Sequence, residues 1–261
     1  MSVTWTDINA FDVPEHFSRY PAGIANNAVE VETAINKVID ASCSSGSKEW
    51  KKAKIRHSNP DNNPFAICHC TAFPDRLIML SCIIELAWIN DDVTEELEHK
   101  AKACGVDPAS APAVVKVLTN YLRTFDASDE DFTTMDKYNP YRVANCGYWI
   151  SSFFIRWGMD LTLTDAEYAQ IASFDFSMGI ILGLTNDYYS WAVEKDQVTD
   201  RMRNAVRVLM NEYNVPDTIA KSLLRGLIVD EEEKAARLKR EILDDGPSAA
   251  VMQYIDAIEL V

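Results

Sequence analysis

The sequence predicts an all-α protein, and three observations support this fold class. Apolar residues recur at helical spacing along most of the chain, whereas alternating, strand-like stretches are hard to find. The chain has 261 residues, of which 48% are hydrophobic, so it can bury a large core. No internal repeat is visible. We therefore expect one domain, residues 1–261, built as a helical bundle.

Turn and helix signals place the elements along the chain. In the first sixty residues, Tyr20–Gly23 indicates a turn, Val29–Ala41 a helix and His57–Pro64 a loop. The longer helices expected after this loop are one that opens at Pro74 and runs through an acidic motif, then Pro108–Phe125, Tyr141–Trp157, Thr164–Glu194 and Asp217–Leu243. The last has an amphipathic pattern whose charged face, Asp230–Arg240, we expect to face solvent.

Charge and hydropathy exclude several classes of function. The net charge of −15 argues against a nucleic-acid partner, because a phosphate backbone requires a basic surface. No apolar stretch approaches the length of about 18 residues typical of a membrane helix, and the N-terminus lacks the pattern of a signal peptide. We therefore expect no membrane span and a cytoplasmic protein.

The segment Asn186–Glu194 carries the strongest signal for chemistry. Its oxygen-bearing side chains Asn186, Ser190 and Glu194 are spaced four apart. Four residues advance about 400° on an α-helix, so these three side chains project from one face. An amide carbonyl, a hydroxyl and a carboxylate are hard donors that suit Mg²⁺ with bound waters and a phosphate. The spacing therefore predicts a magnesium site.

A second acidic element lies upstream, at Asp91, Asp92 and Glu95. Reading back by helical spacing, Trp88 and Ile84 share the face of Asp91, so this helix changes from apolar to acidic along one stripe. The helix predicted around Asn186–Glu194 likewise changes from apolar residues to oxygen donors along one face. Two such helices would form a deep, dry pocket with an ion-binding mouth, although a solvated acidic segment would also explain the upstream cluster.

Together, Asp91-Asp92-x-x-Glu95 and Asn186-Asp187-x-x-Ser190-x-x-x-Glu194 resemble the metal motifs of class I terpene cyclases. The surrounding residues are similar to the cyclase domains of fungal chimeric di- and sesterterpene synthases of the fusicoccadiene synthase type. The resemblance implies a class I terpenoid synthase bundle around a deep apolar pocket, with three Mg²⁺ ions. It also implies ionisation of a linear isoprenoid diphosphate, with geranylgeranyl diphosphate as first choice, then carbocation cyclisation to a cyclic terpene and release of diphosphate.

The resemblance also implies roles for individual residues. Asp91 would be catalytic as well as a metal ligand, and Arg142 would sense the diphosphate, with Asn145 as linker residue and Cys146 as effector. A guanidinium makes forked contacts to phosphate oxygens, which suits this role. Lys195 is a further candidate for diphosphate binding. The alternatives are an ordinary surface or capping Arg and a solvated Lys.

Four aromatic side chains near these motifs are candidates for the wall of the substrate pocket: Phe65, Trp88, Trp149 and Phe153. The face of an aromatic ring attracts a carbocation as it attracts an ammonium group. In the predicted helix Tyr141–Trp157, the last two share a face with Arg142 and Cys146. Gly183 would admit the ligand. For each of these positions, ordinary core packing is the alternative.

The sequence departs from the pattern of these cyclases at its end. They continue past a final helix to an Arg-Tyr pair, whereas the only such pair here is Arg19-Tyr20, so we expect that segment to be missing. The prenyltransferase half of the chimeric relatives is also absent from the chain and would be a fused or separate partner. The sequence leaves open whether the protein forms a homodimer. The alternative functions are a chain-elongating isoprenyl diphosphate synthase, which would need a second Asp-rich motif, and a non-catalytic acidic helical domain.

Overall fold

The computed structural model describes residues 5–9, 13–89, 111–125, 132–196 and 203–260. Helices dominate this part of the chain, which confirms the all-α prediction. By its internal packing the chain divides into a first unit, residues 1–122, 150–162 and 253–261, and a second unit, residues 123–149 and 163–252. Each unit is described by itself. The single cyclase domain stays a prediction.

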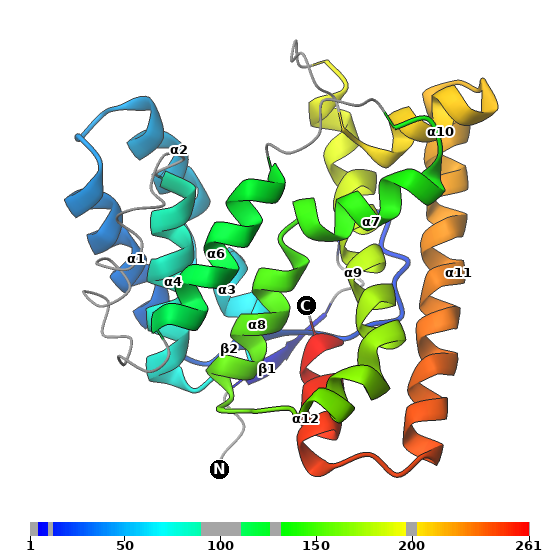
Figure 1. Cartoon of the computed structure of the whole chain (residues 1–261). Helices are drawn as coiled ribbons and strands as arrows, with labels where there is room; N and C mark the ends of the chain where they lie inside the picture. Colours follow the sequence, from blue (N-terminus) through cyan, green and yellow to red (C-terminus); the bar gives the residue numbers. More distant parts are fainter. Residues whose placement is uncertain (1–4, 10–12, 90–110, 126–131, 197–202, 261) are drawn as a thin grey trace. The chain divides into compact units, whose positions relative to one another are not determined.

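The first unit contains a short antiparallel sheet and several helices. Strand β1 (Trp5–Ile8) pairs with β2 (Ala22–Ala25). The helices that follow in this unit are α1 (Ala28–Ser42), α2 (Lys48–Arg56), the 3₁₀ turn η2 (Pro60–Asn62), α3 (Pro64–Cys68), α4 (Pro74–Ile89) and α6 (Ala111–Phe125). Helix α1 packs along α4 (Figure 1). Most of α8 (Tyr148–Gly158) and of α12 (Ala249–Ile258) also belongs to this unit.

Local sequence explains where these helices begin and which face they bury. Val31, Ile35 and Ile39 recur every fourth residue along α1 and are fully buried, so they form its core-facing stripe. The Asn63 side chain accepts hydrogen bonds from the backbone N–H groups of Phe65 and Ala66, which caps the N-terminus of α3. The apolar core of this unit is therefore built on α1, α3 and α4.

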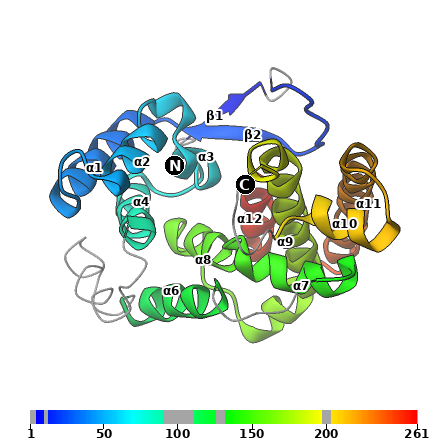
Figure 2. The ribbon, with the colours of Figure 1, turned by 90° about the horizontal axis from the view of Figure 1, so that it is seen from above.

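The second unit is built around the long helix α9 (Asp165–Glu194). Helices α7 (Met135–Asn145), α10 (Ala205–Tyr213) and α11 (Asp217–Asp244) pack against it. Helix α9 begins with a capping box in which Thr164 and Glu167 bond each other's backbone N–H groups. Figures 1 and 2 show α9 and α11 side by side along much of their length.

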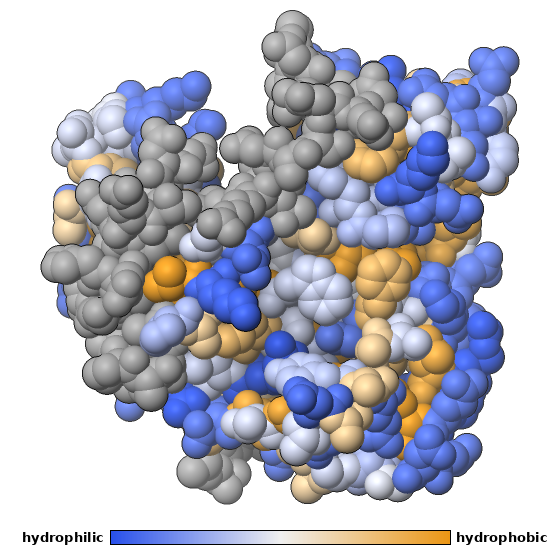
Figure 3. Space-filling view, viewed as in Figure 1, coloured by the Kyte–Doolittle hydropathy of each residue, from blue (hydrophilic) through white to orange (hydrophobic). Residues whose placement is uncertain are grey.

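Helix α11 has the amphipathic character that its sequence predicts. Leu224, Ile228 and Ala235 are buried, whereas Asp230 and Arg240 are exposed. Glu232, within the stretch expected to face solvent, is buried with the apolar residues. In Figure 3 hydrophilic residues line the edge of the view where Figure 1 places α11. None of the helices in the described ranges is long and apolar enough to cross a membrane.

The predicted helix Tyr141–Trp157 is wrong as one element. Helix α7 ends at Asn145 and α8 begins at Tyr148, because Gly147 between them adopts a φ of 82°, a left-handed conformation that ends helices. Trp149 and Phe153 therefore do not continue the helical face of Arg142.

The other predicted helices are confirmed to within a few residues as α1, α6, α9 and α11, and α4 opens at Pro74 as expected. The acidic motif that α4 was expected to reach lies outside the described residues. The predicted turn Tyr20–Gly23 is wrong in its second half, because Ala22 and Gly23 belong to β2. Elements that the pattern did not predict are β1, β2, α2, α3, α10, α12 and η2, which lies inside the predicted loop His57–Pro64.

Two glycines in helices of the second unit should respond in opposite ways to replacement by Ala. A Cβ at Gly179 of α9 would come within 2.6 Å of Val143 and 2.9 Å of Tyr148, whereas one at Gly226 of α11 would meet nothing within 4 Å. We expect Gly179→Ala to lower the free energy of unfolding by roughly 1–3 kcal/mol through overpacking. Gly226→Ala should raise it by about 0.5–1 kcal/mol, because Ala loses less backbone entropy. Urea unfolding of both variants measures this, and equal effects would contradict the packing described here.

Candidate metal centre

The predicted oxygen donors occupy the last turns of α9. This helix is continuous through Glu194, so Asn186, Ser190 and Glu194 do project from one face. The Asn186 side chain is exposed and the other two are half-buried. The donors therefore lie where a ligand from solvent can reach them.

The Asn204 side chain joins two of these donors. Its Nδ2 group lies 3.3 Å from Ser190 Oγ and 3.0 Å from Glu194 Oε2, and it donates to the backbone carbonyl of Asp187 at 3.0 Å. Its Oδ1 accepts from the backbone N–H of Val206 at 2.9 Å and so caps α10. The hydroxyl and carboxylate oxygens thus converge on one N–H donor group. Sequence reasoning missed Asn204, although an Asn before an apolar run is a helix-start signal.

The Arg142 side chain crosses from α7 to the same face of α9. Its Nη2 donates to Asn186 Oδ1 at 2.6 Å and pairs with Asp187 Oδ1 at 2.8 Å. Nε donates to the carbonyl of Gly183 at 3.3 Å, and Nη1 donates to Asn145 Oδ1 at 2.9 Å. Only 9% of Arg142 is exposed. The predicted sensor, Arg142, is therefore in direct contact both with the predicted linker, Asn145, and with the predicted donor Asn186.

Asp187 carries the charge opposite to that of Arg142, and sequence reasoning assigned no role to this position of the motif. Besides Arg142, its carboxylate accepts from the Tyr138 hydroxyl at 2.7 Å and from the backbone N–H of Ala205 at 2.9 Å. Burial raises the pKa of Asp187 to about 6, while Arg142 and the two hydrogen bonds act in the opposite direction. For Arg142, burial is the largest influence and acts to lower the pKa, but Asp187, Tyr138, Cys146 and Glu194 together outweigh it, so the pKa is raised. The guanidinium is therefore charged.

Gly183 and Cys146 border the Arg142 side chain. A Cβ at Gly183 would lie 2.8 Å from Arg142 Cγ, so the absence of a side chain makes room for the guanidinium stem. Cys146 is the C-cap of α7, and its thiol lies 3.4 Å from the carbonyl of Val143. Burial raises the pKa of this thiol, although Arg142 opposes the shift, so Cys146 is a neutral group.

Lys195 is the C-cap of α9, next to the donor face. Its Nζ lies 3.9 Å from Asp217 Oδ2, and 41% of the side chain is exposed. An exposed pair at this distance contributes little to stability. Lys195 is thus available to a ligand, and its role in diphosphate binding stays a prediction.

The donor set fits a hard divalent cation. In the described ranges no group of three or more His, Cys, Asp and Glu side chains could hold a metal ion, which leaves an amide, a hydroxyl and one carboxylate as ligands. Asn204 and Arg142 now hold these oxygens with positively polarised N–H groups, in positions where a cation would make similar contacts. Asp91, Asp92 and Glu95, the other predicted ligands, lie outside the described residues.

Two of the predicted pocket aromatics are in contact in the first unit. Phe65 is 3% exposed and its ring centroid lies 5.0 Å from that of Trp88, which is 42% exposed. Phe153 packs edge-on against Phe154 at 5.3 Å. In the second unit, Trp149 is 42% exposed and lies edge-on to Tyr148. Whether these aromatics line a substrate pocket stays a prediction.

Comparison with known proteins identifies the family. Residues 79–234, more than half of the chain, match the family model described as terpene synthase family 2, C-terminal metal binding. The chain belongs to this family. Within terpene synthase family 2, the matched range includes both predicted metal motifs, and the description of the family names metal binding.

Individual terpene synthases agree with this assignment. A terpene cyclase of Stachybotrys chlorohalonatus is 30% identical over 148 residues, 55% of this chain and 39% of that protein. Fusicoccadiene synthase of Phomopsis amygdali is 23% identical over 235 residues, 71% of this chain and 33% of that protein. This chain thus spans little more than a third of these relatives. The crystal structure of aristolochene synthase from Penicillium roqueforti has a TM-score of 0.73 at 18% identity over 95% of both chains, which confirms the class I terpene synthase fold.

Removing the partner of the buried guanidinium should destabilise the protein. We expect Asp187→Ala to lower the free energy of unfolding by about 3–5 kcal/mol, because it leaves the Arg142 charge buried without its counter-ion. Asp230→Ala, at an exposed position of α11, serves as the control and should change stability by no more than about 0.5 kcal/mol. Urea titrations at neutral pH compare the two. Similar small effects would mean that Arg142 does not depend on Asp187.

Proposed function

We propose that this chain is a Mg²⁺-dependent terpene cyclase that ionises a linear isoprenoid diphosphate, with geranylgeranyl diphosphate as the first choice, and releases a cyclic terpene and diphosphate. The observation that carries the proposal is the contact of Arg142 with Asn186, beside Ser190 and Glu194 on one face of α9. A guanidinium, the kind of group that suits phosphate binding, thereby lies beside a set of oxygen donors in a member of a metal-binding terpene synthase family.

The charge of the chain supports a role for metal ions. With a net charge of −15, the protein can hold a diphosphate only if cations lie between the two. Arg142 supplies one positive group, and by family resemblance three Mg²⁺ ions supply the rest. Bound Mg²⁺ would neutralise the charge that develops on the departing diphosphate.

The contacts of Arg142 indicate how the side chains around it would respond to Mg²⁺ and diphosphate. Nη2 of Arg142 is bonded to Asn186 Oδ1. If Asn186 were to hold Mg²⁺ through this oxygen, Nη2 would be free to donate to a phosphate oxygen. Asn145, which accepts from Nη1, would follow the movement of the guanidinium and pass it on to Cys146 at the end of α7. Binding of metal and of diphosphate would therefore be coupled through one side chain.

The relatives suggest the source of the substrate. The protein of Talaromyces wortmannii that matches 81% of this chain is named a bifunctional sesterterpene synthase, and this chain spans 35% of it. We propose that a prenyltransferase, fused or separate, supplies the diphosphate to this cyclase. Geranylfarnesyl and farnesyl diphosphates are then the next candidates after geranylgeranyl diphosphate.

Incubation with the three diphosphates tests the proposed reaction. We expect purified protein with Mg²⁺ to convert one of them to a cyclic hydrocarbon or alcohol, detected by mass spectrometry of an organic extract, and to form none in excess chelator. A longer linear diphosphate, formed with added isopentenyl diphosphate, would indicate chain elongation instead. Product formed equally well in chelator, or no product from any substrate, would contradict the proposal.

Replacement of one donor tests the metal site directly. Ser190→Ala should weaken Mn²⁺ binding, measured by electron paramagnetic resonance in the presence of inorganic diphosphate, by at least about tenfold. Ser173→Ala is the matched control, because Ser173 lies exposed on the same helix, away from the donor face, and it should leave Mn²⁺ affinity unchanged. Equal affinities of the two variants would argue against Ser190 as a ligand.

A further inference from the structure

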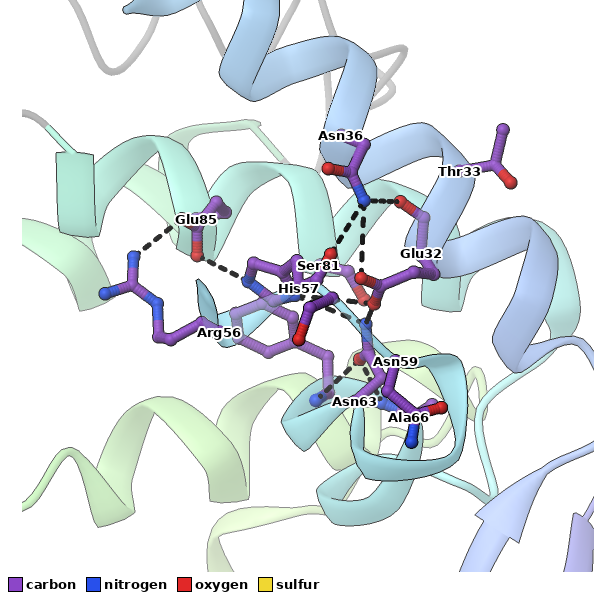
Figure 4. Close-up of polar contacts among 12 residues, drawn as sticks. Glu32, Thr33, Asn36, Arg56, His57, Asn59, Asn63, Ala66, Ser81 and Glu85 are labelled. Carbon is purple, nitrogen blue, oxygen red and sulfur yellow. Dashed lines mark hydrogen bonds and ion pairs between the residues drawn. The ribbon is translucent and has the colours of Figure 1, made fainter. Parts of the chain in front are cut away.

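A buried polar network surrounds Glu85 in the first unit, apart from the donor face of α9. Glu85 lies on α4 and is 0% exposed. Its Oε1 accepts from Arg56 Nη2 at 2.7 Å, and its Oε2 lies 3.0 Å from His57 Nε2 (Figure 4). On the other side of the imidazole, Nδ1 lies 3.6 Å from Glu32 Oε2 of α1. One carboxylate of α4 is thus bonded to two neighbouring basic side chains.

Each of these two basic side chains stacks on one of the predicted pocket aromatics. The Arg56 guanidinium lies over the Trp88 ring, 5.1 Å from its centroid. The His57 ring is stacked on Phe65, with centroids 5.6 Å apart and an interplanar angle of 17°. Phe65 also contacts Trp88. The contacts therefore form a closed circuit that runs from Glu85 through Arg56, Trp88, Phe65 and His57 back to Glu85.

Further hydrogen bonds fix the network to α1 and α3. The amide of Asn63, whose oxygen caps α3, donates to Glu32 Oε2 at 2.5 Å. The amide of Asn36 donates to Glu32 Oε1 at 3.3 Å and to the carbonyl of His57 at 3.0 Å. The imidazole of His57 therefore has little freedom to rotate, and its stacking on Phe65 restricts the ring of Phe65 as well.

The carboxylates of Glu32 and Glu85 are both buried here, and stability alone does not explain them. Burying carboxylates is costly, and well-packed apolar side chains would often stabilise a core as well or better. A fully bonded polar network does fix one arrangement of the side chains around it. Here the side chains around it are two aromatic rings, of which Trp88 keeps 42% of its surface exposed. The guanidinium covers part of one face of this indole, and the exposed remainder is open to a ligand.

We propose that Glu85 is a positioning residue that, through Arg56 and His57, fixes the orientation of the Phe65–Trp88 pair and thereby determines which products the cyclase releases. The inference rests on the proposed function. A ring stabilises a cation only when its face is turned toward the charge, so the angle of the indole decides which carbocation in the cyclisation it favours. An indole that is free to rotate would favour several carbocations and hence several products.

Two variants loosen this circuit without removing the aromatics. Arg56→Met keeps an apolar stem over Trp88 but removes the charge, while His57 keeps its contact with the buried Glu85 carboxylate. Glu85→Gln keeps the shape of the buried side chain but removes its charge, which weakens its hydrogen bonds to Arg56 and His57. If both variants change the Trp88 resonance and the product ratio in the same way, the effect comes from the network and not from a packing defect of one substitution.

The same unit offers a matched control. Arg76 lies over the ring of Trp157 at 5.2 Å and pairs with Asp160 at 2.9 Å, which repeats the Arg–Trp–carboxylate arrangement around a different tryptophan. Arg76→Met therefore removes the same kind of contact from a tryptophan that has no proposed role in catalysis.

The position of Trp88 can be followed without any turnover. The chain has six tryptophans, so protein labelled with 5-fluorotryptophan gives up to six ¹⁹F resonances, and the one lost in Trp88→Phe identifies Trp88. We expect Arg56→Met and Glu85→Gln to shift or broaden the Trp88 resonance and to leave that of Trp157 unchanged. Arg76→Met should do the reverse. A Trp88 resonance that is the same in wild type and in both network variants would overturn the proposal.

Product analysis tests the consequence for specificity. With the diphosphate that the wild type converts, the ratio of the main product to the summed minor products should fall by about two- to fivefold in Arg56→Met and Glu85→Gln. Arg76→Met should leave the ratio unchanged. This ratio does not depend on the amount of folded enzyme, so a change in yield alone, with the ratio constant, would mean a purely structural role and overturn the inference. If the wild type forms no cyclic product, the proposed function fails instead, and the ¹⁹F result still stands.

Discussion

The burial of the Arg142 guanidinium is the constraint on which the second unit depends. A buried cation without partners would be costly, and here every side of it is satisfied by a residue of α7 or α9. Asp187 supplies the opposite charge, and Gly183 supplies the space for the side chain. Asn145 lies three residues after Arg142 on α7, so its Oδ1 is within reach of Nη1. The fold around Arg142 therefore arranges the same residues that the proposed reaction would use.

The donor face is preorganised by the same principle. Arg142 holds Asn186, and Asn204 holds Ser190 and Glu194, in each case through N–H donors. Oxygens that neighbouring side chains already hold in place need less reorganisation when they bind a ligand.

Sequence reasoning could predict the features that depend on local spacing. The bounds of α9 follow from Thr164 and Glu167, and the shared face of Asn186, Ser190 and Glu194 follows from the helical period. The end of α7 could not be predicted in this way, because Gly147 ends the helix only by adopting a positive φ, and an isolated Gly is tolerated within many helices.

Residues that act through long-range contacts were also missed or underestimated. Asp187 is a fixed position of the motif to which no role was assigned, and Asn204 lies 17 residues from Asp187, whose backbone carbonyl it bonds, at the start of a helix that the pattern did not predict. Likewise, the buried circuit around Glu85 joins residues of four separate elements, so no periodicity could reveal it. Such contacts arise from packing and become visible only in the folded chain.

Calorimetric titration of the wild-type protein with inorganic diphosphate tests the central claim most directly, because it requires neither a substrate nor a product. If cations bound to the α9 donors hold the diphosphate together with Arg142, diphosphate should bind in the presence of Mg²⁺ and not in excess chelator. Binding of the same strength in chelator, or no binding in Mg²⁺, would contradict the account.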